Sequence, residues 1–226
     1  MNQPILVFDM DGVLVDVTAS YRAAIAQTVE HFTGIAVDNA EIQELKNQGG
    51  FNDDWRLSHH LVTSKGKEVD FDDVKAHFQR VFLGDGGNGL ILRERWVARP
   101  GVLEKLGERF RFAVFTGRPR EEAALTLDRL AGGLTFDPII AMEDVEHHKP
   151  APDGLQQIVA RHPGSKVFYI GDSIDDARSA SAAGVPFIGI AAPSNPAYLD
   201  LVFLFQAQGA YAIVDDINYL DEVFAS

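Results

Sequence analysis

The sequence contains no cysteine, which excludes a disulfide framework and any chemistry that needs a thiolate. Positive charge is also scarce, because 20 lysine and arginine residues stand against 33 aspartate and glutamate residues, for a net charge of -13. A chain with this balance repels polyanions on average, so we expect no nucleic-acid partner.

Long hydrophobic runs are missing as well. The longest apolar stretch near the C-terminus, residues 198–205, contains Asp200 and is too short to span a bilayer. No basic residues precede the short apolar run at the N-terminus, so it does not have the pattern of a secretory signal. We expect a soluble, cytoplasmic protein with no membrane partner. The apolar residues 199–205 fit either a core helix or an exposed dimer patch, and both a monomer and a homodimer remain open.

Short apolar runs that alternate with helical patterns indicate the fold class. Residues 4–8, 112–115, 167–170, 187–190 and 212–214 have the composition of strands buried on both faces. Helical spacing occurs between them, at residues 121–130, 153–161 and 175–183. This alternation predicts an α/β fold with a doubly wound parallel sheet.

Residues 17–96 interrupt the alternation, because four successive segments there have helical rather than strand spacing. The segments are residues 18–32, 39–46, 53–62 and 71–82. We therefore predict a core formed by residues 1–16 and 97–226, with a helical insertion at residues 17–96.

Polar residues come directly after three of the predicted strands. Asp9 and Asp11 follow the first strand, Thr116 and Gly117 the second, and Asp172 to Asp176 the third. Ligands of open α/β sheets bind at the carboxyl ends of the strands, so we expect these residues to form one site. Each segment also has a simpler interpretation, since acidic turns and helix caps use the same residue types.

The chemistry of these residues suits phosphate transfer. One carboxylate of the Asp9–Asp11 pair can attack phosphorus while the other moves a proton, with a hard cation between them. Thr116 and Gly117 offer hydroxyl and backbone donors to phosphoryl oxygens, and Lys149, fixed before Pro150, is a restrained cation.

The order of these segments resembles the haloacid dehalogenase-like (HAD) hydrolase superfamily, in its phosphoglycolate phosphatase and β-phosphoglucomutase branch. The resemblance covers essentially the whole chain. It implies a Rossmann-like core, with the insertion as a helical cap domain. It further implies an Mg²⁺-dependent phosphatase that hydrolyses a small phosphate monoester through an aspartyl-phosphate intermediate.

The resemblance also implies a role for each motif residue. Asp9 would be the nucleophile and Asp11 the acid–base residue, while Thr116 and Lys149 would bind the phosphoryl group. The metal would be held by Asp9, the backbone carbonyl of Asp11 and Asp172, with Asp176 in support. Asp175 stands where the family varies.

Four alternatives to a phosphatase arise within this framework. A dehalogenase is disfavoured, because it would not need Asp11 to protonate a leaving alcohol. A phosphonatase would use a cap lysine, for which Lys46 is a candidate. A phosphomutase of the β-phosphoglucomutase type, or a non-catalytic binding protein on the same scaffold, would share the fold.

Substrate choice is assigned to residues 46–56, the loop between two predicted cap helices. Lys46, Asn52 and Arg56 are candidates to bind a polar or anionic leaving group, with Trp55 either shielding it or buried. Phosphoglycolate, a sugar phosphate, a nucleotide and an amino-alcohol phosphate such as histidinol phosphate all fit.

Overall fold

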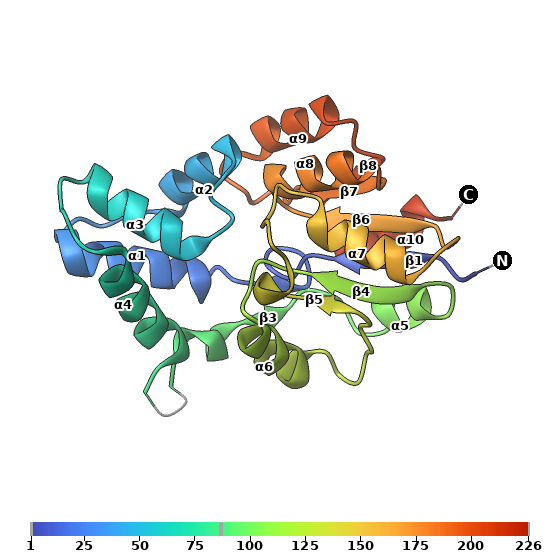
Figure 1. The fold of residues 1–226 in the computed structure, drawn as a ribbon, viewed down its shortest axis with the longest axis horizontal. Coiled ribbons are helices and arrows are strands. Elements are labelled where there is room, and N and C mark those ends of the chain that lie inside the picture. Colours follow the sequence, from blue (N-terminus) through green and yellow to red (C-terminus); the bar gives the residue numbers. More distant parts are fainter. Residues whose placement is uncertain (1, 86–87, 226) are drawn as a thin grey trace. The chain divides into compact units, whose positions relative to one another are not determined.

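A parallel sheet is built from strands that lie far apart in the sequence (Figure 1). The computed structural model describes residues 2–85 and 88–225. The strand order is β5-β4-β1-β6-β7-β8. The strands are β1 (Ile5–Phe8), β4 (Arg111–Phe115), β5 (Ile139–Ile140), β6 (Val167–Gly171), β7 (Phe187–Ile190) and β8 (Ala212–Val214).

Strand β1 lies inside the sheet, between β4 and β6. Phe8 pairs with Val114 on one side and with Ile170 on the other. All four residues of β1 are fully buried, which explains why this segment has no polar residue on either face. The predicted α/β fold with a parallel sheet is confirmed.

Helices flank this sheet (Figure 1). They are α5 (Val102–Gly107), α6 (Arg120–Leu130), α7 (Asp153–Arg161), α8 (Ile174–Ala183), α9 (Tyr198–Ala207) and α10 (Leu220–Val223), with the 3₁₀ helices η2 (Met142–Asp144) and η3 (Ile217–Tyr219). Strand β5 and helix α5 had no predicted counterpart, because two and six residues are too few to show a period.

Helix α9 combines the two interpretations of residues 199–205. Leu201 and Phe205 are buried against the core, whereas Leu199 and Phe203 are 76% and 68% exposed. The helix therefore packs on one face only.

The chain divides into two units, Met1–Val15 with Trp96–Ser226, and Asp16–Arg95. The short strands β2 (Val15–Asp16) and β3 (Arg95–Trp96) stand where the chain passes from one unit to the other. The sheet and its flanking helices belong to the first unit.

The second unit is helical. It contains α1 (Tyr21–Thr33), α2 (Asn39–Gln48), α3 (Asp54–Ser64), α4 (Phe71–Leu83) and the 3₁₀ helix η1 (Leu90–Arg93). Helices α1 and α4 share an aromatic core, in which the ring centroid of Tyr21 lies 4.0 Å from that of Phe82 and 5.9 Å from that of Phe78. In residues 2–85 and 88–225, we find no helix long and apolar enough to cross a membrane.

Close packing of the core gives the first prediction. A Cβ atom on Gly154 of α7 would lie 2.2 Å from the buried ring of Phe115, so one of the two must move. We expect Gly154→Ala to lower the free energy of unfolding by about 1–3 kcal/mol, measured by denaturant titration.

Gly107 of α5 is the matched control, since its added Cβ would meet Phe112 at 3.7 Å, an ordinary contact. Gly107→Ala should be neutral or stabilising by up to about 1 kcal/mol. Equal destabilisation by both substitutions would contradict the packing described for Gly154.

Candidate active site

Three neighbouring strands deliver polar side chains to one edge of the sheet. Asp9 follows β1, Thr116 follows β4 and Asp172 follows β6. The backbone N–H of Asp9 donates to Ile170 and that of Thr116 to Ile140, so the strand ends stay in register beyond the last paired residues. The carboxyl ends of the central strands therefore meet as the sequence predicted.

Lys149 joins two of the aspartates. Its ammonium lies 2.9 Å from Asp9 Oδ1 and 2.8 Å from Asp176 Oδ1, and its side chain is 1% exposed. The rings of Phe115 and Tyr169 lie 4.9 and 5.5 Å from the same nitrogen. Burial opposes the charge on Lys149, but the two carboxylates outweigh it and raise its pKa. Lys149 is thus a fixed buried cation rather than a solvated surface residue.

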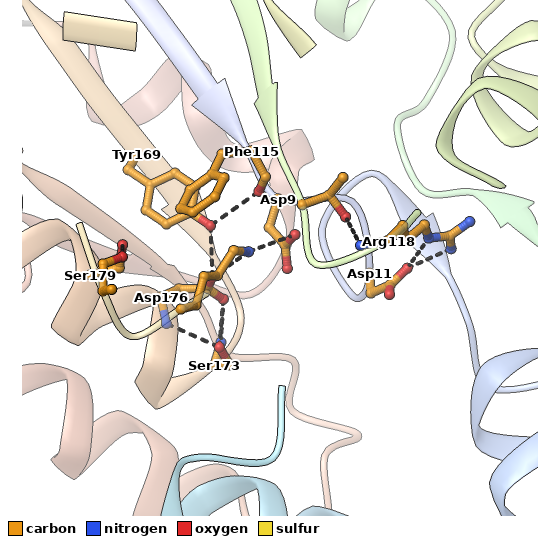
Figure 2. Close-up of polar contacts among 11 residues, drawn as sticks. Asp9, Asp11, Phe115, Arg118, Tyr169, Ser173, Asp176 and Ser179 are labelled. Atoms are coloured by element: carbon orange, nitrogen blue, oxygen red, sulfur yellow. Dashed lines mark hydrogen bonds and ion pairs between the residues drawn. The ribbon is translucent and has the colours of Figure 1, made fainter. Parts of the chain in front are cut away.

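Asp176 is held by donors on both carboxylate oxygens (Figure 2). Oδ1 accepts from Lys149 and, at 2.7 Å, from the hydroxyl of Tyr169. Oδ2 accepts from the hydroxyl of Ser173 at 2.6 Å and from its backbone N–H at 3.1 Å. Burial disfavours ionised Asp176, yet the charge of Lys149 and these hydrogen bonds keep its pKa below the usual value.

For Asp9, the effects that raise the pKa prevail over those that lower it. Burial raises its pKa well above the usual value, and the charges of Asp176, Asp11 and Asp172 add to this, while Lys149 opposes it. Since Lys149 is shared with the better-bonded Asp176, the charge on Asp9 is under-compensated by the side chains around it. A further positive charge beside Asp9 would therefore stabilise its ionised carboxylate.

Asp11 contacts an arginine that was not among the predicted site residues. Arg118 donates to Asp11 Oδ1 from Nε at 2.7 Å and from Nη2 at 2.5 Å (Figure 2). It stands two residues after Thr116, and its backbone N–H donates to the Thr116 hydroxyl at 3.2 Å. An arginine in a polar loop is normally exposed, so no sequence pattern marked this one as buried.

Tyr169 was also missed, because a tyrosine in an apolar strand is normally a packing residue. Its hydroxyl is buried and reaches both Asp176 and the carbonyl of Phe115, the latter at 3.3 Å. Burial and the charges of Asp176 and Asp9 raise its pKa, so it is a neutral donor. Asp175, whose role was open, is buried in the first turn of α8 and lies 3.7 Å from Arg178.

A metal ion fits the aspartates of this site. Asp9, Asp172 and Asp176 each offer a carboxylate oxygen, and these oxygens lie within 4.8 Å of one another. An all-oxygen donor set of this kind suits a hard cation, which would also offset the mutual repulsion of neighbouring carboxylates. Both oxygens of Asp176 already accept hydrogen bonds, which suits this residue to a supporting place in the donor set.

Gly12 shapes the approach to Asp172. Its φ is +72°, and a Cβ built on it would lie 1.8 Å from Asp172 Oδ2. Only glycine combines this left-handed backbone with such a close approach.

The residues proposed for substrate choice belong to the second unit. Lys46 pairs with the mostly buried Asp54 at 2.8 Å, while Arg56, whose side chain is 72% exposed, lies 3.5 Å from Asp53. Asp53 caps α3. Trp55 is buried beneath Lys75, whose ammonium lies 3.8 Å from the ring centroid, so the buried alternative for Trp55 holds. The roles of Lys46, Asn52 and Arg56 toward substrate stay predictions.

Comparison with known proteins identifies the family. The model of haloacid dehalogenase-like hydrolases matches residues 4–184. The chain belongs to the haloacid dehalogenase-like hydrolase family. This hydrolase is therefore an enzyme. Its strand order is that of the parallel α/β sheet described above.

Relatives of this hydrolase carry more specific names. It is 28% identical over 227 residues to phosphoglycolate phosphatase of Shigella dysenteriae, covering 93% of this chain and 89% of that protein. It is 32% identical over 200 residues to imidazoleglycerol-phosphate dehydratase of Phytophthora nicotianae, covering 84% of this chain but only 44% of that protein. A solved haloacid dehalogenase-like hydrolase from Bacteroides fragilis has the same fold, with a TM-score of 0.74 at 22% identity, covering 97% of this chain and all of that one.

The Gly12–Asp172 contact gives the second prediction. We expect Gly12→Ala to displace the Asp172 carboxylate and to weaken divalent-cation binding at the aspartate cluster, titrated calorimetrically, by about 10–100-fold. Gly101→Ala is the matched control, because Gly101 also has a positive φ, +89°, but no atom within 4 Å of an added Cβ. Both substitutions strain the backbone, so an equal change in cation affinity would refute the specific role of Gly12.

Proposed function

We propose that this hydrolase is an Mg²⁺-dependent phosphatase that cleaves a small phosphate monoester through an aspartyl-phosphate on Asp9. The observation that carries the proposal is the buried contact of Lys149 with Asp9, beside two further carboxylates. A nucleophilic carboxylate, a fixed cation and a metal-ligand set together suit phosphoryl transfer. The match to phosphoglycolate phosphatase over nearly the whole chain supports the same reaction.

In the first step, a carboxylate oxygen of Asp9 attacks phosphorus in line with the leaving oxygen. The bond from phosphorus to the leaving oxygen breaks as Asp11 donates a proton to it. Lys149 offsets the charge on the equatorial oxygens, and the hydroxyl of Thr116 and the N–H of Gly117 donate hydrogen bonds to them. Asp9, the backbone carbonyl of Asp11 and Asp172, with Asp176 in support, would hold an Mg²⁺ ion, which would supply further charge stabilisation when bound.

In the second step, Asp11, now ionised, removes a proton from a water molecule that attacks the phosphorylated Asp9. The bond between phosphorus and Asp9 breaks, inorganic phosphate leaves, and Asp11 is protonated again. Water as the acceptor distinguishes the phosphatase from a phosphomutase, which would return the phosphoryl group to a sugar.

The third prediction tests this chemistry. Asp9→Asn should abolish phosphate release from phosphate monoesters in the presence of Mg²⁺, because an amide cannot act as the nucleophile. The measurement is colorimetric phosphate release with and without a chelator, alongside circular dichroism to verify folding. Asp215→Asn, the same change at an exposed aspartate, is the control and should keep full activity. Retained phosphate release in Asp9→Asn would refute the mechanism. Transfer of the phosphoryl group to a sugar by the wild-type enzyme, in place of phosphate release, would favour the phosphomutase.

We further propose that residues 17–96 act as a helical cap that selects the substrate. The names of the relatives suggest phosphoglycolate and imidazoleglycerol phosphate for a substrate panel. Histidinol phosphate, a hexose phosphate and a nucleoside monophosphate, which the sequence left open, complete the panel. The panel is ranked by kcat/KM.

The fourth prediction uses Arg56, whose exposure makes it a cleaner probe than Lys46. Removing Lys46 would leave Asp54, 8% exposed, without its ion pair, so a loss of activity could follow from instability. Arg56→Ala should raise KM for the preferred anionic substrate by about 10-fold, as expected for one charge-assisted hydrogen bond, and should leave thermal stability unchanged. Arg80→Ala on α4 is the matched control. An unchanged substrate ranking in Arg56→Ala would remove Arg56 from the substrate site.

A further inference from the structure

Arg118 is buried to an extent that demands an explanation. It is 2% exposed, although it stands in the loop between β4 and α6. Taking a guanidinium out of water costs several kcal/mol unless its donors are paired. The partner at the other end of the ion pair, Asp11, is separated by 107 positions in the sequence and keeps 26% of its side chain exposed. The arginine is thus the enclosed member of the pair and the carboxylate the accessible one.

The guanidinium of Arg118 donates its hydrogen bonds to two particular side chains. Nε and Nη2 both donate to Oδ1 of Asp11, and Nη1 donates to the hydroxyl of Thr126 on α6 at 2.9 Å. Two donors on one oxygen fix the plane of the carboxylate and leave Oδ2 to other partners. A protonated carboxyl group keeps one carbonyl-type oxygen that only accepts hydrogen bonds. Because Oδ1 already accepts from two donors, it is suited to be that accepting oxygen, and Oδ2 is the atom suited to carry a proton.

We propose that Arg118 is a positioning residue, which acts through Asp11 by directing the exchangeable proton to Oδ2 and holding that oxygen toward the leaving group. The inference rests on the acid–base role proposed for Asp11. The proton leaves Oδ2 as the bond between phosphorus and the leaving oxygen breaks. It returns to Oδ2 from water as the bond between phosphorus and Asp9 breaks, so protons balance over the cycle.

If Arg118 had only a structural role, its loss would have a different effect on the reaction rates. Through Thr126, Arg118 also braces its loop against α6, and loss of a brace should slow all substrates alike. Loss of proton positioning should slow only esters whose leaving group needs a proton. The stable p-nitrophenolate anion departs without one, whereas an aliphatic alkoxide does not.

The test compares kcat/KM for p-nitrophenyl phosphate and for the best aliphatic ester of the substrate panel. This ratio reports the steps up to departure of the leaving group, so the later hydrolysis of the aspartyl-phosphate does not enter. We expect Arg118→Met to lower kcat/KM by at least 10-fold for the aliphatic ester, within the range of general acid catalysis, and less than about 3-fold for the aryl ester. Equal losses for both esters, or no loss for either, would overturn the proposal.

Two further variants separate charge and bracing from geometry. Arg118→Lys keeps the charge but cannot place two donors on one oxygen, so it should behave like Arg118→Met. It also carries the test if Arg118→Met fails to fold. Thr126→Val removes the contact with α6 and should affect the two esters equally; a selective loss in this variant, or wild-type kinetics in Arg118→Lys, would refute the positioning role.

Asp11→Asn distinguishes failure of this inference from failure of the proposed function. If Asp11→Asn shows no difference between the esters, the acid role of Asp11 itself is wrong. If Asp11→Asn discriminates and the Arg118 variants do not, only the positioning role is wrong. The double variant Asp11→Asn with Arg118→Met should lose no more than Asp11→Asn alone, because both changes remove the same interaction.

Discussion

The buried ammonium of Lys149 determines the electrostatics of the site. A carboxylate at the end of a fully buried strand would remain protonated without positive charge nearby, and a lone buried lysine would be equally unfavourable. Lys149 lies within 2.9 Å of Asp9 and 2.8 Å of Asp176, so each charge makes the others tolerable. Tyr169 and Ser173 add donors to Asp176 alone, which leaves Asp9 as the less stabilised carboxylate. That difference suits a division of labour in which Asp176 orients Lys149 and Asp9 reacts.

The loop after β4 connects this charge cluster to the second carboxylate. Thr116 accepts the N–H of Arg118, and the side chain of Arg118 extends to Asp11. The same short loop thus carries Thr116, a candidate hydrogen-bond donor to phosphoryl oxygens, and Arg118, which holds the side chain of Asp11. In such an arrangement, the two aspartates after β1 have separate surroundings: Asp9 is enclosed with Lys149, and Asp11 is partly exposed beside an enclosed arginine.

Features that depend on burial and chain order could be predicted from the sequence, whereas features that depend on side-chain direction could not. Strand β1 was predictable because a strand with neighbours on both sides is apolar at every position, and this run ends directly at Asp9. Helix α7 was predicted with its observed bounds from its regular apolar spacing. Arg118 and Tyr169 could not be assigned, because their residue types suggest a surface residue and a packing residue, respectively. The contact of Arg118 with Asp11 depends on the pairing of β1 with β4, and that of Tyr169 with Asp176 depends on the turn from β6 into α8.

The position of β1 has a consequence for the growing chain on the ribosome. Its neighbours β4 and β6 begin at Arg111 and Val167, so the first strand stays unpaired on at least one side until most of the chain has been synthesised. The second unit is a continuous segment, Asp16–Arg95, and its entire sequence emerges before either neighbour of β1. Long-range pairing of this kind is slow and exposes apolar strand edges in the meantime. The pairing of β1 on both sides is therefore completed only after β6 has emerged, long after β1 itself has been synthesised.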